Sequence, residues 1–241
     1  MNQALGQSAK RHSESVAVGE GAMPVYISLP TKQPAPAVIV LQEVFGINDE
    51  VKAITDLIAG SGYVGLAINV YHRSAPELSE PFTREGLARA SATIAPVTQG
   101  SIRTDVRAAV DWLNTQPAVR FGHVATWGFG ATLGIVAATI SGVDAAIVFE
   151  EGSTVFDDDC FADIERIRAP LLLIFTAEDD EKKPTCVSHL ESALQAANKS
   201  ILLQRYPPAE ETRGFGVSAF PAAVIADAWD LVQAFLQRTM L

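Results

Sequence analysis

Short apolar runs alternate along this chain with segments of helical period, and this alternation restricts the fold more than any other feature. Apolar runs typical of buried parallel strands occur at 37–41, 63–71, 123–127, 145–149, 171–175 and 201–206. Between them, apolar residues recur at the spacing of one helix face, as at Ile102, Val106, Ala109, Val110 and Leu113. The pattern predicts βαβ units, and hence an α/β fold in which helices flank a mostly parallel central sheet in a three-layer sandwich.

Length and composition fit one domain over residues 15–241. The chain has 241 residues, of which 48% are apolar and 19% charged, so it can bury a sizeable core. No linker divides it, and Gly19 to Gly21 predict a hairpin turn within residues 16–29. Residues 1–14 are polar and predict a flexible tail.

Charge and cysteine content exclude several classes of partner. Against 18 Lys and Arg there are 28 Asp and Glu, a net charge of −10, which argues against nucleic acid or an anionic membrane as a partner. We find neither an apolar stretch of membrane-spanning length nor the apolar core of a signal peptide. Two cysteines are too few for a disulfide framework, so we expect a cytoplasmic protein. The oligomeric state does not follow from the sequence.

A parallel α/β sheet binds its ligands at the carboxyl ends of its strands, so the residues after each apolar run are candidates for a site. They are Gln42-Glu43, His72-Arg73, 128–132, Glu150-Glu151, 178–180 and 210–215.

Residues 123–134 carry the most specific of these signals. They read as a strand that turns through glycines into a helix, the form of a nucleophile elbow. In such elbows a Ser or Cys occupies the sharp turn between small residues. The corresponding residue here is Gly130, which has no side chain to attack a substrate.

Several segments together resemble the dienelactone hydrolase family. They are Gln42-Glu-Val-Phe-Gly46, Gly62-Tyr63, Tyr71-His-Arg-Ser-Ala-Pro76, the Trp127–Gly130 elbow, the 177–179 turn and the stretch 206–215. The resemblance covers about residues 16–240. It implies an α/β-hydrolase fold and hydrolysis of a small lactone or ester that carries a carboxylate.

The resemblance also implies roles for individual residues. In that family a Cys attacks the lactone, a His moves the proton, an Asp orients the His, a Glu holds the thiol proton at rest, and arginines bind the substrate carboxylate. The matching positions are Gly130 for the Cys, Arg213 for the His, Asp179 or Asp180 for the Asp, Glu43 for the Glu and Arg73 for one arginine. Backbone N–H groups of Val44 and Ala131 match the oxyanion donors. Two of the three triad members are therefore replaced.

Thr132 and the two cysteines are the other candidate nucleophiles. Thr132 also lies between small residues, but a hydroxyl needs a base, and His72 is the histidine expected nearest the site. A helical Thr132 could equally bond its own backbone or pack beneath the turn. Acidic neighbours would raise the pKa of Cys160, and Cys186 lies on a helix stripe, so both cysteines are interpreted as structural.

The charged candidates keep alternative interpretations. Glu43 could act as general acid or base, or bond backbone amides. Arg73 and Arg213 could clamp a carboxylate or phosphate, or Arg213 could pair with Asp179. Glu150 and Glu151 could be rim carboxylates, or hold a divalent cation with Asp179 and Asp180; we expect no metal and no other cofactor.

Three functions follow as hypotheses. The leading one is a protein with a degenerate triad that binds a small anionic or lactone-like metabolite and drives isomerisation or cyclisation through Glu43. The second is an active lactone or ester hydrolase that uses Thr132, or a water activated by Glu43 and His72. The third is a non-catalytic interaction protein on a hydrolase scaffold.

Overall fold

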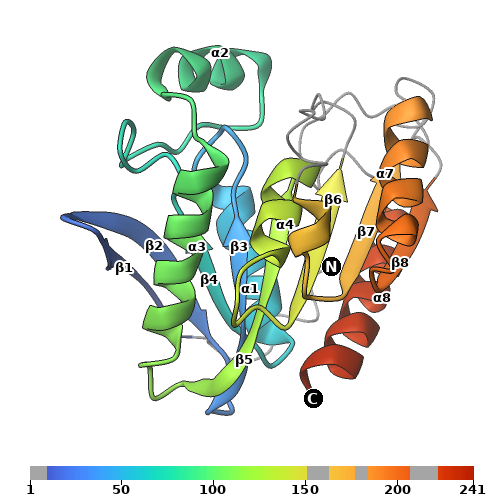
Figure 1. Ribbon diagram of the computed structural model, residues 1–241. Helices are drawn as coiled ribbons and strands as arrows, with labels where there is room; N and C mark the ends of the chain where they lie inside the picture. Colours follow the sequence, from blue (N-terminus) through green and yellow to red (C-terminus); the bar gives the residue numbers. More distant parts are fainter. Residues whose placement is uncertain (1–9, 151–162, 177–183, 207–221) are drawn as a thin grey trace. The chain divides into compact units, whose positions relative to one another are not determined.

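The computed structural model describes residues 10–150, 163–176, 184–206 and 222–241 (Figure 1). Backbone hydrogen bonds order the strands β1-β2-β4-β3-β5-β6-β7-β8, and the strand pairs β3/β4, β6/β7 and β7/β8 are parallel. The predicted mostly parallel sheet with flanking helices is thus confirmed. The chain divides into two compact units, Met1–Thr126 and Trp127–Leu241, and the expectation of a single domain over residues 15–241 stays a prediction.

The first unit opens with the predicted hairpin. β1 (Lys10–Val18) and β2 (Gly21–Leu29) are antiparallel, with Lys10 opposite Leu29. Residues 10–14 were expected in a flexible tail. They belong to the sheet instead, because the pairing of β1 with β2 continues as far as Lys10. β2 in turn runs antiparallel to β4 (Val64–Ile68).

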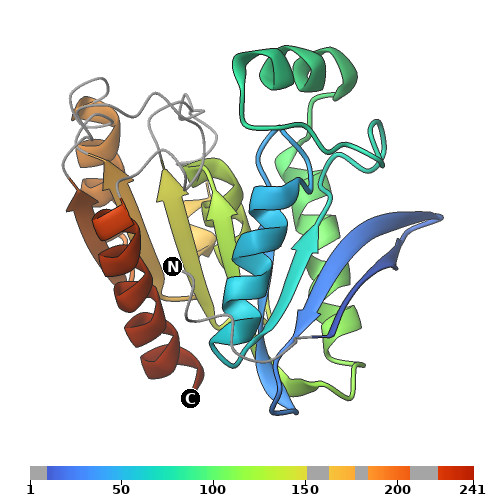
Figure 2. The same ribbon diagram turned by 180° about the vertical axis from the view of Figure 1, so that it is seen from behind.

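β3 (Ala35–Leu41) lies parallel to β4, and all its residues are buried. α1 (Asp49–Gly60) and α3 (Gln99–Leu113) cover opposite faces of these strands (Figures 1 and 2). The five stripe residues predicted on α3 are all buried, which confirms that helix and its inward face. Between β4 and α3 the chain forms a further helix, α2 (Arg84–Thr93), whose residues are mostly exposed.

The second unit follows the predicted alternation of strands and helices. The last residues of β5 (Val119–Phe129) lead into α4 (Ala131–Ala138), and β6 (Ala145–Glu150), β7 (Leu171–Thr176) and β8 (Ile201–Tyr206) follow in parallel register. The short 3-10 helix η1 (Ile164–Arg166) precedes β7, α7 (Pro184–Ala196) connects β7 to β8, and α8 (Ala222–Met240) ends the chain. In the parts of the chain that the structure describes, no helix is both long and apolar enough to cross a membrane.

Candidate active site

The elbow of the second unit has the backbone that its glycines predict. Gly130 stands between β5 and α4 with φ 92° and ψ 139°, in the region that L side chains rarely adopt. Its N–H donates a 2.9 Å hydrogen bond to the carbonyl oxygen of Phe149 on β6, which fixes the turn. The position that carries a nucleophile in such elbows is therefore well defined here and bears no side chain.

Two further glycines of this elbow are required by packing. A Cβ on Gly128 would lie 2.7 Å from the Cα and N of Gly134, and a Cβ on Gly134 would lie 2.5 Å from Cγ2 of Val148. Real Cβ atoms essentially never show contacts this short. The small residues around Gly130 thus allow β5, α4 and β6 to approach closely.

Ala131 and Thr132 are the first two residues of α4, and Thr132 is half-buried. The Thr132 hydroxyl makes no hydrogen bond with another described residue. Because Thr132 lies within the helix and not on the turn, it lacks the backbone position of an elbow nucleophile. The roles expected for both residues stay predictions.

In the first unit, the loop after β3 carries Glu43 and Val44, both half-buried. The N–H of Gly46 donates to the carbonyl of Glu43 at 3.3 Å and closes a tight turn in which Gly46 has φ 81°. We find no hydrogen bond from the Val44 N–H to another described residue. This donor is therefore available to an oxygen atom of a ligand, as the resemblance implies.

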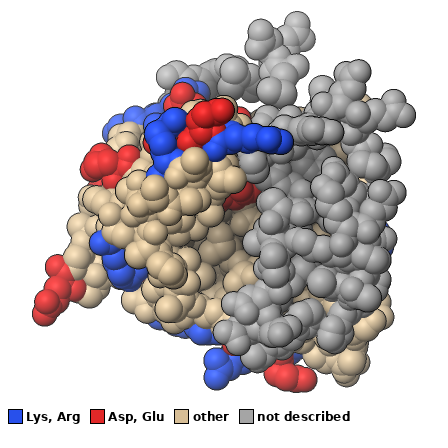
Figure 3. All heavy atoms as spheres, turned by 90° about the horizontal axis from the view of Figure 1, so that it is seen from above, with Lys and Arg blue, Asp and Glu red and all other residues tan. Residues whose placement is uncertain are grey.

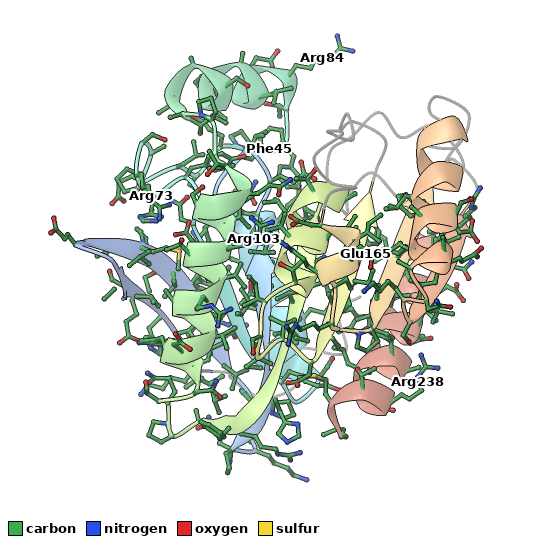
Figure 4. All side chains as sticks on the ribbon, in the orientation of Figure 1. Phe45, Arg73, Arg84, Arg103, Glu165 and Arg238 are labelled. Carbon is green, nitrogen blue, oxygen red and sulfur yellow. The ribbon has the colours of Figure 1, made fainter. Side chains whose placement is uncertain are left out.

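A second loop, residues 76–82, holds this turn in place. Glu80 N donates to the Phe45 carbonyl at 2.8 Å, and Ile47 N donates to the Leu78 carbonyl at 3.2 Å. A Cβ on Gly46 would overlap the backbone carbonyl of Leu78. Phe45, which lies below α2 in Figure 4, packs on Phe82 with ring centroids 4.7 Å apart. Hydrogen bonds to the loop 76–82 thus hold the backbone beside Glu43 in place, and we call this pairing of the two loops the clamp.

Buried amides connect the ends of β3 and β4. The side chain of Gln42 donates from Nε2 to Oδ1 of Asn69 at 2.8 Å, and the backbone N of Tyr71 donates to the same oxygen at 2.9 Å. Burial, together with the negative charge of Glu43, raises the pKa of the Tyr71 phenol to about 12. The Tyr71 side chain therefore lies within electrostatic reach of Glu43 and remains protonated at neutral pH.

His72 and Arg73 both contact a carboxylate that the sequence analysis did not single out. Arg73 donates from Nη1 and Nη2 to the two oxygens of Asp105 at 2.9 and 2.7 Å, and His72 Nε2 lies 3.3 Å from Asp105 Oδ1. Asp105 on α3 is fully buried, whereas 45% of the Arg73 side chain is exposed beside the first turns of α3 (Figure 4). The hydrogen bonds to Asp105 raise the pKa of Arg73. Whether Arg73 also binds a ligand stays a prediction.

The surface above this unit carries both signs of charge. Seen from above, acidic and basic side chains lie next to one another over α2 (Figure 3). Arg89 of α2, for example, donates from Nε and Nη2 to Glu80 at 2.9 and 2.7 Å. This surface therefore does not form a single-sign patch for a large charged partner.

Several predicted residues lie outside the described residues, namely Glu151, Cys160, Asp179, Asp180 and Arg213. Glu150 is the last residue of β6, and Cys186 belongs to α7. Within the described ranges, no three His, Cys, Asp or Glu side chains gather as a metal site would require. The predicted carboxylate clamp and the cation alternative therefore remain predictions.

Comparisons with known proteins agree with one another. The family model described as the dienelactone hydrolase family matches residues 23–240. A Synechocystis sp. protein named "Putative carboxymethylenebutenolidase" is 30% identical over 217 residues, covering 85% of this chain and 87% of its own.

Solved structures support the fold. The crystal structure of a dienelactone hydrolase-like promiscuous phosphotriesterase from metagenomic libraries has a TM-score of 0.77 at 18% identity, over 98% of this chain and 100% of that one. A dienelactone hydrolase from Anabaena variabilis gives a TM-score of 0.67 at 15% identity, with the same coverage. At these identities the likeness extends to the fold alone.

Proposed function

The chain belongs to the dienelactone hydrolase family, and from this premise we propose that it binds a small carboxylate-bearing lactone and isomerises it by proton transfer through Glu43, without a covalent intermediate. The observation that carries this proposal is Gly130: the turn of the elbow is present, and the attacking side chain is absent. A family member with that change retains the use of binding and acid–base groups, but not acyl transfer through the elbow.

The substrate class follows from the names of the relatives. A carboxymethylenebutenolidase acts on a butenolide, an unsaturated five-membered lactone, that bears a carboxylate on its side chain. Arg73 suits that carboxylate. Its two terminal nitrogens are engaged with Asp105, and its Nε–H makes no hydrogen bond to another described residue. The Nε–H and the remaining N–H of the adjacent terminal nitrogen point to the same side of the guanidinium, and together they can bind a second carboxylate.

Proton transfer suits the surroundings of Glu43. In a carboxymethyl-substituted butenolide, the conjugated carbonyl acidifies the ring C–H next to the ring oxygen. Glu43 would remove this proton, leaving a dienolate, and return it to the carbon beside the carbonyl, which moves the double bond. The N–H of Val44 would stabilise the negative charge that develops on the carbonyl oxygen.

The test follows a carboxymethyl-substituted butenolide in deuterated water, with wild-type protein and Glu43→Gln. We expect ring deuteration and a shifted double bond with the wild type, and at least a hundredfold slower exchange with Glu43→Gln, the range of general acid–base catalysis. Glu20→Gln, in the exposed hairpin turn, is the matched control and should behave as wild type. Deuteration at equal rates in wild type and Glu43→Gln would contradict the proposal.

Hydrolysis by an activated water is the second candidate, and the contact between His72 and Asp105 favours it. A histidine beside a buried carboxylate is oriented as a general base usually is. The same experiment separates the two functions, because hydrolysis yields an open-chain diacid without ring deuteration. Loss of that product in His72→Gln would establish the second candidate in place of the first.

A further inference from the structure

Building on the proposed function, we infer that Tyr71 is a catalytic residue of the same site, and that its hydroxyl donates a hydrogen bond to the ligand oxygen that becomes negatively charged when Glu43 removes a proton. The family resemblance assigns no role to this side chain. Three features of Tyr71 support this role: the position of its backbone, the lack of a described hydrogen-bond partner for its hydroxyl, and the negative charge of Glu43 nearby.

The buried amide of Asn69 fixes where Tyr71 lies. Its Oδ1 accepts both the backbone N–H of Tyr71 and the side-chain amide of Gln42, while its Nδ2 donates to the carbonyls of Ala75 and Pro76 at 3.0 Å each. Asn69 and Gln42 are almost fully buried. Because Gln42 directly precedes Glu43, one amide group holds the backbone of Tyr71 against the turn that carries the proposed base.

The Tyr71 hydroxyl lacks the hydrogen-bond partner that a buried phenol normally has among the described residues. Only 8% of the residue is exposed, and a buried tyrosine normally finds a partner for its hydroxyl. The Tyr71 hydroxyl makes no hydrogen bond to another described residue. A buried donor without such a partner can donate to a ligand oxygen.

Burial and the negative charge of Glu43 together keep the Tyr71 phenol protonated and therefore a hydrogen-bond donor. Burial and that carboxylate raise the pKa of the phenol, so at neutral pH Tyr71 donates a proton to a hydrogen bond and does not act as a base. When Glu43 takes a proton, the negative charge moves from its carboxylate to the ligand oxygen. A donor close to both positions stabilises the charge after the transfer, which is the role of an oxyanion-hole group.

Tyr71→Phe tests the hydroxyl alone, and Tyr63→Phe is its matched control. Tyr63 directly precedes β4, whereas Tyr71 follows the other end of that strand, and both rings are buried. We expect Tyr71→Phe to slow deuterium exchange into the carboxymethyl-substituted butenolide by about tenfold or more, the range for a hydrogen bond to a charged group, with unchanged circular dichroism. Tyr63→Phe should stay within about twofold of wild type. Equal rates in Tyr71→Phe and wild type would overturn the inference.

A second measurement does not depend on turnover. The chain has four tyrosines, so protein labelled with ¹³C at the tyrosine ζ carbon gives four NMR signals, and Tyr71→Phe identifies one of them. We expect Glu43→Gln to shift the Tyr71 signal and to leave that of Tyr63 in place. An unmoved Tyr71 signal would show that the two groups are not neighbours and would overturn the inference. If the signal shifts but the wild type exchanges no deuterium, the proposed reaction fails while the pairing of Tyr71 with Glu43 stands.

Discussion

At the scale of single residues, the buried charge of Asp105 shows how one side chain organises its neighbours. It lies on the inward stripe of α3, between Ile102 and Val106, where a charge is costly unless it is paired. Arg73 and His72 supply that pairing from the turn after β4. The arginine that the family resemblance assigns to the ligand therefore also anchors this turn to α3.

Removal of Arg73 should consequently destabilise the fold. Arg73→Ala leaves the fully buried Asp105 with His72 as its remaining described partner, and we expect a loss of about 2–3 kcal/mol in unfolding free energy. The matched control is Arg89→Ala, which removes two hydrogen bonds of the same lengths from an exposed salt bridge with Glu80, and it should change stability little. Urea denaturation measures both. Equal losses in the two variants would show that burial of Asp105 has no energetic consequence.

The double variant Arg73→Ala/Asp105→Asn provides a further check. It removes the unpaired charge as well as its partner, and should be more stable than Arg73→Ala alone.

The sequence predicts a site residue when its place at a strand end puts it there. It does not predict a residue whose role depends on contacts with distant parts of the chain. Gly130 and Glu43 could be placed at strand ends from the sequence, because an apolar run followed by a turn marks a strand end. Asp105 had one signal, a charge on an apolar helical stripe, which requires a cation that the sequence does not identify. Tyr71 had none, because the hydrogen bond between Asn69 and Gln42, which brings it near Glu43, depends on which strands pair.

At the scale of elements, the clamp between residues 43–48 and 76–82 determines where Glu43 stands. Asn48 serves both loops: its Oδ1 caps α1 by accepting the Val51 N–H at 3.0 Å, and its Nδ2 donates to the Glu80 carbonyl at 2.9 Å. The start of α1 and the loop before α2 are thus tied together through a single side chain. The proposed base is held by two segments that no local sequence pattern connects.

Gly46→Ala should break this clamp. The substitution adds a Cβ that overlaps the Leu78 backbone, and it also imposes strain at φ 81°. Gly62→Ala, with φ 95° and open space around the added Cβ, isolates the strain term and should cost about 1–2 kcal/mol. We expect Gly46→Ala to lose at least about 1 kcal/mol more in urea denaturation, and to slow the reaction of Glu43 as well. A loss no larger than that of Gly62→Ala would mean that the loops are not in tight contact.

The regular elements were predictable wherever burial imposes a period. Each predicted strand overlaps a strand of the structure, although the apolar run 63–71 continues beyond the end of β4 at Ile68, and α3 buries the predicted stripe. α2 was not predicted because most of its residues are exposed, so no apolar face marks it. The hairpin was recognised from its glycines, but its length was not, since β1 is exposed over most of its residues.

At the scale of the whole molecule, the tyrosines act together on stability at high pH. All four have a pKa raised above the ordinary value of 10.0, in each case chiefly by burial, and the pKa of Tyr26 and of Tyr71 reaches about 12. Tyr26 and Tyr206 also donate to the carboxylates of Asp56 and Asp227, which oppose ionisation further.

These shifts fix how stability depends on pH. Well below pH 10 each tyrosine is protonated in both the folded and the unfolded chain, so the tyrosines do not make the unfolding free energy depend on pH. Above pH 10 the unfolded chain loses protons that the folded chain retains, so the unfolding free energy falls as pH rises. For the buried Tyr71 the fall is about 1.4 kcal/mol per pH unit, until its folded pKa is passed near 12. Phenolate absorbance and circular dichroism, followed together as pH is raised, should therefore change in a single transition above about pH 10. Tyr26→Phe removes one linked proton and should move that transition to higher pH. Phenolate formed at the ordinary pKa with an unchanged dichroism spectrum would mean that these rings ionise freely in the folded protein.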